Sequence, residues 1–239
     1  WDLDVDAIQA ALSPRTRIVL LNTPNNPTGR IYPAVTLERL AGVLDRHAGS
    51  RDRPVYVLSD ESYSRIVFDG NPMVTPAAHI PRSLLVHTFS KSSLAPAQRL
   101  GFLALPPTMP DREAFRLAAT GVGLATGNAL PDAVMQYALP DLEGLVVDVG
   151  RLQRRRDRML DALRAAGYEV GTPEATFYLL VRSPDPDDAA FARRLAADDV
   201  LVLPGSVCEL PGWFRISLTA TDDMVDRALP LFAKAISSR

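Results

Sequence analysis

The residues best suited to chemistry lie around one lysine, Lys91. A short apolar run, 84–86, precedes it, and two hydroxyl side chains, Thr88 and Ser90, lie between the run and the lysine. Polar side chains that follow a buried strand typically face a ligand crevice at the C-terminal end of that strand. A lysine amine there can pair with an anion or form a Schiff base with a carbonyl group, and Arg99 could hold an anion beside it. A Ser-Lys pair by itself is more often ordinary surface, so the assignment depends on other stretches.

Two earlier stretches also place polar side chains after apolar runs. Residues 22–29 read Asn-Thr-Pro-Asn-Asn-Pro-Thr-Gly, which predicts a loop of fixed shape that presents amide groups such as that of Asn26. Asp60 and Tyr63 follow the next apolar run in the same way. A plain turn and a strand-end cap are the ordinary alternatives for these two stretches.

The order of the predicted elements brings these loops together. A helix is expected over 34–48, and strands are expected near 17–21, 55–58, 84–86 and 102–105. This order favours a mainly parallel sheet with helical crossovers, in which the C-terminal ends of the strands share one edge. The loops that carry Asn26, Asp60 and Lys91 would then converge on one ligand.

The character of the sequence changes after residue 110. Helical patterns are expected over 111–120, 130–139 and 142–166, and strands and helices then alternate near 176–181, 188–198, 200–203, 213–218 and 221–236. The segment from Arg151 to Arg158 carries five arginines, which we expect to form a solvated helix face. We therefore predict two α/β domains, 1–148 and 149–239, the second entered through a long connecting helix.

Composition narrows the class of protein. A hydrophobic content of 47% with 23% charged residues is ordinary for a globular chain, and the net charge of −2 offers no electrostatic case for nucleic acid or an acidic membrane surface. No apolar run approaches the roughly 18 residues that would span a bilayer. The single cysteine, Cys208, excludes an intrachain disulfide and fits a cytoplasmic location.

One cofactor has a use for all of the groups expected at this sheet edge. Pyridoxal phosphate (PLP) offers an aldehyde for a lysine amine and a pyridine nitrogen that an adjacent carboxylate keeps protonated. Its phenolic oxygen accepts bonds from an amide and a tyrosine hydroxyl, and its phosphate binds arginine and hydroxyl groups. The set of residues therefore predicts a PLP site.

Four stretches also carry a family resemblance. They are, in order, 25–29 (Asn-Asn-Pro-Thr-Gly), 60–63 (Asp-Glu-Ser-Tyr), Ser90-Lys91 followed by Arg99-Leu100-Gly101, and 214–217 (Phe-Arg-Ile-Ser). Through them the chain resembles the class I/II aminotransferase family of fold-type I PLP enzymes. The resemblance implies a PLP-dependent transferase-like α/β fold. Residues 1–148 would be the C-terminal part of a large, mainly parallel-sheet, PLP-binding domain, and 149–239 a smaller C-terminal domain.

The resemblance implies a cofactor role for each matching residue. Lys91 would form the Schiff base and then carry the proton between substrate and cofactor. Asp60 would pair with the pyridinium nitrogen, and Asn26 and Tyr63 would bond the phenolic oxygen. Three further positions match phosphate contacts: Thr88, Ser90 and Arg99.

Substrate binding and reaction follow from the same resemblance. Arg215, with Asn26, would bind the α-carboxylate of a substrate, although an arginine in a strand can also be a surface ion pair. We expect a PLP-dependent aminotransferase that moves an amino group between an amino acid and a 2-oxo acid, as a homodimer in the cytoplasm. β-Lyases and decarboxylases use the same constellation and stay alternatives, as do a ligand-sensing domain of a transcription regulator and an inactive fragment.

The chain departs from the family at its beginning. The family has a long segment before the position that matches Trp1, and this segment supplies part of the phosphate site and several strands of the sheet. A sheet without those strands would expose apolar edges. We therefore expect the chain either to be part of a longer protein or to depend on another chain.

Overall fold

The computed structural model describes residues 1–49, 53–93, 99–128, 130–142 and 144–237. The chain folds as two compact units. Unit 1 consists of Trp1–Pro24, Arg30–Arg65 and Pro72–Val147, and unit 2 consists of Asn25–Gly29, Ile66–Asn71 and Asp148–Arg239. Two short segments, 25–29 and 66–71, therefore belong to unit 2 although they interrupt the sequence of unit 1.

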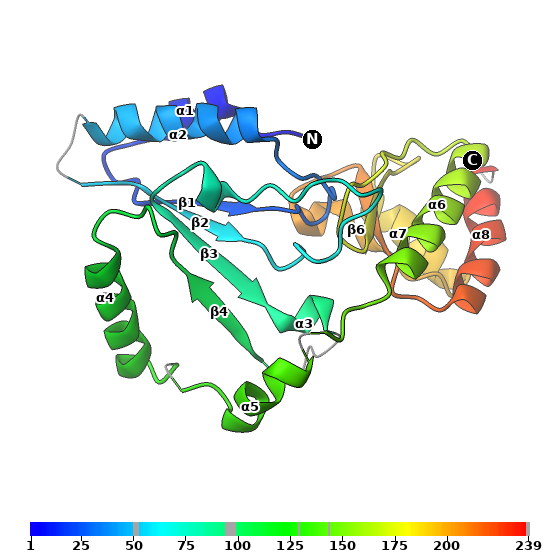
Figure 1. Cartoon of the computed structure of the whole chain (residues 1–239). Coiled ribbons are helices and arrows are strands. Elements are labelled where there is room, and N and C mark those ends of the chain that lie inside the picture. The colour runs from blue at the N-terminus through cyan, green and yellow to red at the C-terminus, as the bar shows by residue number, and fades with distance from the viewer. Residues whose placement is uncertain (50–52, 94–98, 129, 143, 238–239) are drawn as a thin grey trace. The chain divides into compact units, whose positions relative to one another are not determined.

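Unit 1 is built on a four-stranded sheet in the order β1-β2-β3-β4 (Figure 1). The strands are β1 (Ile18–Asn22), β2 (Tyr56–Asp60), β3 (Ser83–Thr88) and β4 (Gly101–Ala104). β1, β2 and β3 are parallel, and β4 runs antiparallel to β3. The three parallel strands therefore end at the same edge of the sheet, where Asn22 is paired with Asp60 and Asp60 with Val86.

Two helices cover one face of this sheet, α1 (Val5–Ala11) and α2 (Ala34–Gly49) (Figure 1). α2 buries Leu37, Leu40 and Val43, whose spacing puts them on one helical face. The same core includes Val57 from β2. These contacts hold β1 and β2 in place, so the ends of the two strands are firmly positioned.

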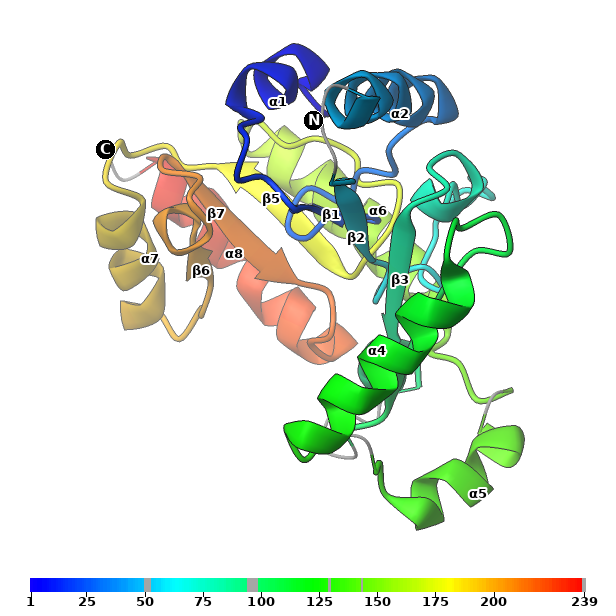
Figure 2. The same cartoon turned by 90° about the vertical axis from the view of Figure 1, so that its left-hand side faces the viewer.

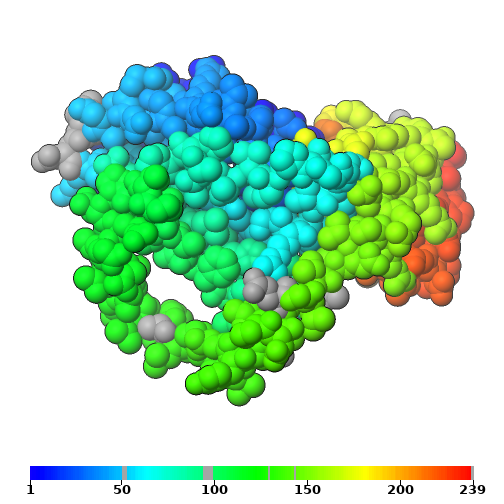
Figure 3. All heavy atoms as spheres, in the orientation of Figure 1, coloured from blue at the N-terminus to red at the C-terminus, as the bar shows by residue number. Residues whose placement is uncertain are grey.

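Other parts of unit 1 leave apolar side chains exposed. β4 has no buried residue among those described, and neither has α4 (Arg112–Ala125) or α5 (Ala133–Leu142). α4 and α5 form an arm that stands off from the sheet (Figures 2 and 3). The exposed apolar side chains include Leu20, Leu103, Leu117, Val122 and Tyr137. Exposed apolar side chains are thus present on β1 and β4, the edge strands of the sheet, as the sequence led us to expect, and also on α4 and α5.

Unit 2 combines a small antiparallel sheet with three helices. The sheet has the order β5-β7-β6, with β5 (Tyr178–Arg182), β6 (Leu203–Pro204) and β7 (Trp213–Ser217), and the helices are α6 (Val149–Ala165), α7 (Asp188–Ala197) and α8 (Asp222–Ser237). Phe191, Phe214 and Phe232 are completely or almost completely buried at its centre, with centroids 5.1 Å apart for the first two rings and 6.3 Å for the last two. The short elements of the chain are η1 (Pro76–Ala78), α3 (Phe89–Ser92) and η2 (Gly205–Cys208).

The structure corrects two predictions about the segment before and within α6. The helix predicted over 142–166 is wrong at its start, because α5 ends at Leu142 and α6 begins at Val149, where the Asp148 carboxylate caps the helix by accepting from the Arg151 amide at 2.8 Å. The solvated face is also wrong for two of the five arginines. Arg155 and Arg156 are buried and make ion pairs within unit 2.

None of the helices among the described residues is long and apolar enough to cross a membrane.

Candidate active site

Asp60 is the last residue of β2, and hydrogen bonds from described residues reach one of its two carboxylate oxygens. Its Oδ1 accepts from the Ser62 amide at 3.1 Å and from the Ser62 hydroxyl. The Asp60 carbonyl accepts from the Thr23 amide at 3.0 Å and from Asn22 Nδ2 at 3.1 Å, which ties this position to the end of β1. Asp60 Oδ2 has no hydrogen bond among the described residues. An oriented carboxylate with one open oxygen suits a ligand that carries a protonated ring nitrogen.

Lys91 and Tyr63 lie near each other beside this carboxylate-bearing edge. Lys91 is in α3, which begins directly after β3, so the single helical turn places the lysine just beyond the end of the strand. Its Nζ lies 6.0 Å from the centroid of the Tyr63 ring. Tyr63 is buried and Lys91 is half-buried. The structure therefore brings the predicted amine and phenol within reach of one small ligand.

Thr88, Ser90 and Arg99 form the third group of predicted residues. Thr88 Oγ1 accepts from the Ser90 amide at 3.2 Å and lies 2.9 Å from Ser90 Oγ. Arg99 has a φ of 51°, in the left-handed region, and Gly101, two residues later, pairs with Thr88 of β3. A Cβ at Gly101 would lie 2.5 Å from the His87 carbonyl, so only glycine permits this close return.

Thr88 and Arg99 both line a shallow hollow of about 380 Å³ along β3 and β4. A hydroxyl and a guanidinium that face one hollow are suited to an anion such as a phosphate group. Residues 94–98, which join Lys91 to Arg99 along the chain, lie outside the described residues.

The two remaining predicted residues, Asn26 and Arg215, contact each other in unit 2. Arg215 Nη1 donates to Asn26 Oδ1 at 2.9 Å, and the guanidinium carbon lies 4.0 Å from the centroid of the Tyr178 ring. Two neighbours thus orient the Arg215 side chain, one by a hydrogen bond and one by its aromatic face. The pair is placed to bind a carboxylate with the guanidinium while the Asn26 side chain holds it still.

The loop that carries Asn26 is fastened to unit 2 by its backbone. The Gly29 carbonyl accepts from the amides of Glu174 and Ala175 at 3.0 and 3.1 Å. Gly29 has a φ of +71°, and a Cβ there would lie 2.3 Å from the side chain of Pro173. Glycine at position 29 is therefore required for the loop to lie this close to residues 173–175.

Six of the eight predicted site residues lie in unit 1 and two, Asn26 and Arg215, lie in unit 2. Two further residues take part that were not predicted as site residues. Ser62 lies within the 60–63 motif and had been given no role at the site, and its amide and hydroxyl both donate to the Asp60 carboxylate. Tyr178 was not singled out, because its contact with Arg215 joins two strands and leaves no mark in the local sequence.

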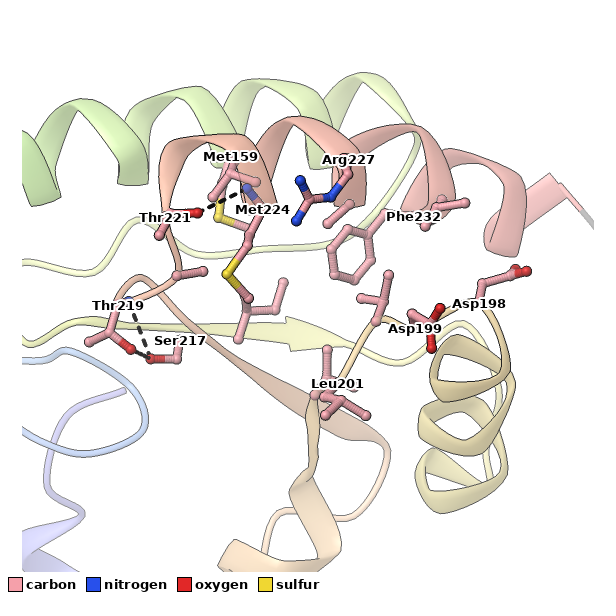
Figure 4. A pocket seen from close by; sticks show the side chains of 17 residues that line it. Met159, Asp198, Asp199, Leu201, Ser217, Thr219, Thr221, Met224, Arg227 and Phe232 are labelled. Carbon is pink, nitrogen blue, oxygen red and sulfur yellow. Dashed lines mark hydrogen bonds between the residues drawn. The ribbon is translucent and has the colours of Figure 1, made fainter.

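A cavity larger than the hollow of Thr88 and Arg99 lies elsewhere among the described residues. It has a volume of about 750 Å³, lies in unit 2, and is lined mainly by side chains such as Met159, Leu201, Met224 and Phe232 (Figure 4). None of the predicted site residues lines it, and neither does any lysine, histidine or cysteine. A large cavity without such side chains is a weaker candidate for an active site than the sheet edge that carries Asp60 and Lys91.

Comparison with known proteins gives a consistent result. The family model described as "Aminotransferase class I and II" matches residues 1–231. The aspartate/prephenate aminotransferase of Thermus thermophilus is 29% identical over 245 residues, which cover 98% of this chain and 60% of that protein. The aspartate aminotransferase of Rhizobium meliloti is 33% identical over 256 residues, again covering 98% of this chain and 60% of the relative.

Solved structures agree with the sequence relatives. An amino transferase from Eubacterium rectale has a TM-score of 0.93 at 28% identity, covering 98% of this chain and 59% of that one. The aspartate aminotransferase from Rhizobium meliloti has a TM-score of 0.83 at 32% identity, covering 98% and 62%. The mainly parallel sheet and these neighbours confirm the predicted fold class, a fold-type I PLP-dependent transferase.

The chain belongs to the class I and II aminotransferase family, whose members use PLP, as the sequence resemblance implied. It spans about 60% of the length of the curated relatives that it matches.

Proposed function

We propose that this chain forms part of a PLP-dependent aminotransferase, which moves an amino group between an amino acid and a 2-oxo acid. The observation that carries the proposal is the arrangement of Lys91, Tyr63 and Asp60 at one sheet edge, in a chain of the aminotransferase family. The donor set fits PLP, because this cofactor requires an amine, an oriented carboxylate and donors for a phosphate group, and a hydroxyl and a guanidinium line the hollow along β3 and β4.

When bound, PLP supplies an aldehyde that condenses with amines and a ring that draws electrons from the substrate Cα. The Lys91 amine would hold the cofactor and later accept and return the Cα proton as a general base and acid. Asp60 Oδ2 would accept a bond from the ring nitrogen and keep it protonated. Tyr63 and Asn26 would donate to the phenolic oxygen.

The remaining predicted residues would hold the charged groups. Thr88 and Ser90 hydroxyls and the Arg99 guanidinium would bind the phosphate group. Arg215 would bind the substrate α-carboxylate in its planar fork, with its orientation already set by Asn26 and Tyr178. We further propose amino acids and 2-oxo acids as substrates, a homodimer as the assembly, and the cytoplasm as the location, on the basis of the family.

The composition of the chain makes a sharp test possible, because it has two lysines, Lys91 and Lys234. Lys234 makes an exposed ion pair with Asp198 at 3.0 Å, so Lys234→Ala is a matched control. The purified chain would be titrated with PLP, followed by visible absorption, reduced with borohydride, and digested for mass spectrometry. We expect a visible band and a reduced adduct on Lys91, unchanged in Lys234→Ala and absent in Lys91→Ala.

An adduct distributed equally over Lys91, Lys234 and the terminal amine would contradict the proposal. So would a band that survives in Lys91→Ala. With PLP bound, a panel that includes aspartate, glutamate and aromatic amino acids should bleach the band, and the amino acid that does so at the lowest concentration identifies the donor.

A further inference from the structure

A buried polar network lies beneath the turn that carries Asp60 and Tyr63. Glu61 is 3% exposed, and its Oε1 accepts from Ser59 Oγ at 3.0 Å and from Thr75 Oγ1 at 2.6 Å. Burial raises the pKa of this carboxyl, with the bonds from Thr75 and Ser59 acting in the opposite direction. The Glu61 side chain is therefore anchored away from the ligand edge, while its neighbour Asp60 faces that edge.

His87 approaches the same residue from the adjacent strand. It follows Val86, the last residue of β3 that pairs with β2, and its Nδ1 lies 3.2 Å from the Glu61 carbonyl oxygen. That oxygen also accepts from the Ser64 amide at 3.0 Å. The backbone of Glu61 is held at both its polar groups, because the Glu61 amide also donates to the Val86 carbonyl at 2.9 Å.

The contact determines which nitrogen of His87 carries the proton. A carbonyl oxygen only accepts hydrogen bonds, so the shorter contact assigns the proton to Nδ1, and the Ser64 hydroxyl, whose Oγ lies 3.5 Å from Nδ1, then takes the acceptor role. Nε2 is buried and has no hydrogen-bond partner among the described residues, and the rings of Phe89 and Phe102 lie 5.5 and 5.2 Å from the imidazole. A second proton on Nε2 would be a buried donor without an acceptor, which is unfavourable. Burial lowers the pKa of His87, in agreement with a neutral ring.

We propose that His87, as the neutral Nδ1–H tautomer, and Glu61 are positioning residues that fix the turn from which Asp60 and Tyr63 meet the cofactor. The assignment rests on the proposed function. His87 also lines the hollow that Thr88 and Arg99 line, but its hydrogen bond reaches the turn and not the ligand edge. His87 acts through the Glu61 carbonyl, and Glu61 acts through Ser59 and Thr75. The Ser62 amide donates to Asp60 Oδ1, so its hydrogen exchange measures how firmly the turn is held.

The test uses three substitutions of one residue. In His87→Asn the side-chain amide nitrogen takes the place of Nδ1 and keeps the donor. In His87→Gln the amide nitrogen lies near the former Nε2, and in His87→Leu there is no donor. Amide hydrogen exchange at Ser62, measured by NMR without PLP, should be about tenfold faster in the Gln and Leu variants and near wild type in Asn, as expected for loss of one buried hydrogen bond.

Several controls make the outcome clear. The chain has three histidines, and His79→Asn should leave Ser62 exchange unchanged. Amides of α2 report whether each variant is folded. If His87→Leu unfolds, the comparison of His87→Asn with His87→Gln still tests the proposal, because both variants carry the same polar amide group and differ in where it lies. Glu61→Gln, which keeps an acceptor oxygen, should preserve Ser62 protection, and Glu61→Met should lose it.

Two results would overturn the inference. One is equal Ser62 exchange in the Asn and Gln variants, and the other is an imidazole spectrum that puts the His87 proton on Nε2. PLP titration of the same variants should give the same order of affinity, with about a tenfold loss for Gln. Absence of any Lys91-dependent binding in the wild-type chain would count against the proposed function, while Ser62 exchange would still decide the role of His87.

Discussion

At the scale of single residues, Arg215 illustrates how a binding side chain is oriented before a substrate arrives. Its guanidinium is bonded to Asn26 and lies on the face of the Tyr178 ring. A planar, delocalised cation can stack and donate at the same time, whereas an ammonium group can do neither with the same geometry. The loss of entropy on binding a carboxylate is smaller when the guanidinium is already held.

We predict that Arg215→Lys weakens binding of the amino-acid substrate by about tenfold to a hundredfold, since a bidentate site is lost and the orienting contacts with it. PLP binding should change less than substrate binding, because Asn26 is the one proposed PLP contact that is bonded to Arg215 and the others lie in unit 1. The measurement is the amino-acid concentration that half-bleaches the visible band of the PLP-loaded chain.

Tyr178 provides the matched comparison for this prediction. Tyr178→Phe keeps the ring beneath the guanidinium and should bind substrate like wild type, whereas Tyr178→Leu should bind it more weakly. Equal substrate affinity in Arg215→Lys and wild type would show that Arg215 does not hold the carboxylate.

At the scale of elements, α6 does more than connect the two halves of the chain. Arg156 is 3% exposed and donates to Asp69 through Nη1 at 2.6 Å and Nη2 at 2.8 Å. It also donates to the Pro173 carbonyl at 3.1 Å and lies 4.7 Å above the Phe68 ring. One helix residue thereby fastens segment 66–71 and the loop at residue 173, against which Gly29 is packed.

This ion pair predicts a dependence of stability on pH. The bond from Arg156 lowers the pKa of Asp69 below its ordinary value of 3.8. A carboxyl whose pKa is lower in the folded state stabilises that state above its unfolded pKa, and this contribution is lost as pH falls through the folded pKa. The protection of segment 66–71 against hydrogen exchange should therefore fall on acidification below pH 3.8.

Asp69→Asn should remove this part of the acid dependence and lower stability at neutral pH by about 1 kcal/mol, a modest amount because Asp69 itself is half-exposed. Glu113→Gln is the control, since Glu113 pairs with Arg116 on the exposed surface of α4. The same acid slope in Asp69→Asn and wild type would contradict the prediction.

At the scale of the whole molecule, the exposed apolar surface of unit 1 is the dominant feature. Ile18 and Leu20 on one face of β1 are 54% and 66% exposed, and Leu117 and Val122 on α4 are 65% and 62% exposed. Apolar surface of this extent is typical of faces that pack against other protein. The edge strands β1 and β4 add unpaired backbone groups to it.

We predict that the 239-residue chain associates with itself in a concentration-dependent manner. Leu117→Lys combined with Val122→Glu should reduce association, because charges on the exposed face of α4 oppose apolar contact. Sedimentation velocity over a hundredfold concentration range measures it, and Arg116→Glu, on the same helix but already charged, is the control. A single monomeric species for wild type at every concentration would disprove the prediction.

Much of the site could be foreseen because its signals are local. The apolar periodicity of residues 34–48 predicts α2 almost to its ends, and the polar residues after each apolar run mark the ends of β1, β2 and β3. Asp60, Tyr63 and Lys91 could be singled out for that reason. Four short motifs in order were sufficient for the family, which the comparisons confirm.

The tertiary structure alone decided what depends on partners distant in sequence. Arg155 and Arg156 look like surface arginines until Asp222 and Asp69 are brought beside them. The sequence places residues 25–29 beside β1, yet contacts with residues 173–175 assign them to unit 2. The tautomer of His87 depends on the carbonyl of Glu61. Local sequence determines which elements form, because propensity and periodicity act over a few residues, whereas burial and ion pairing of single side chains depend on the folded chain around them.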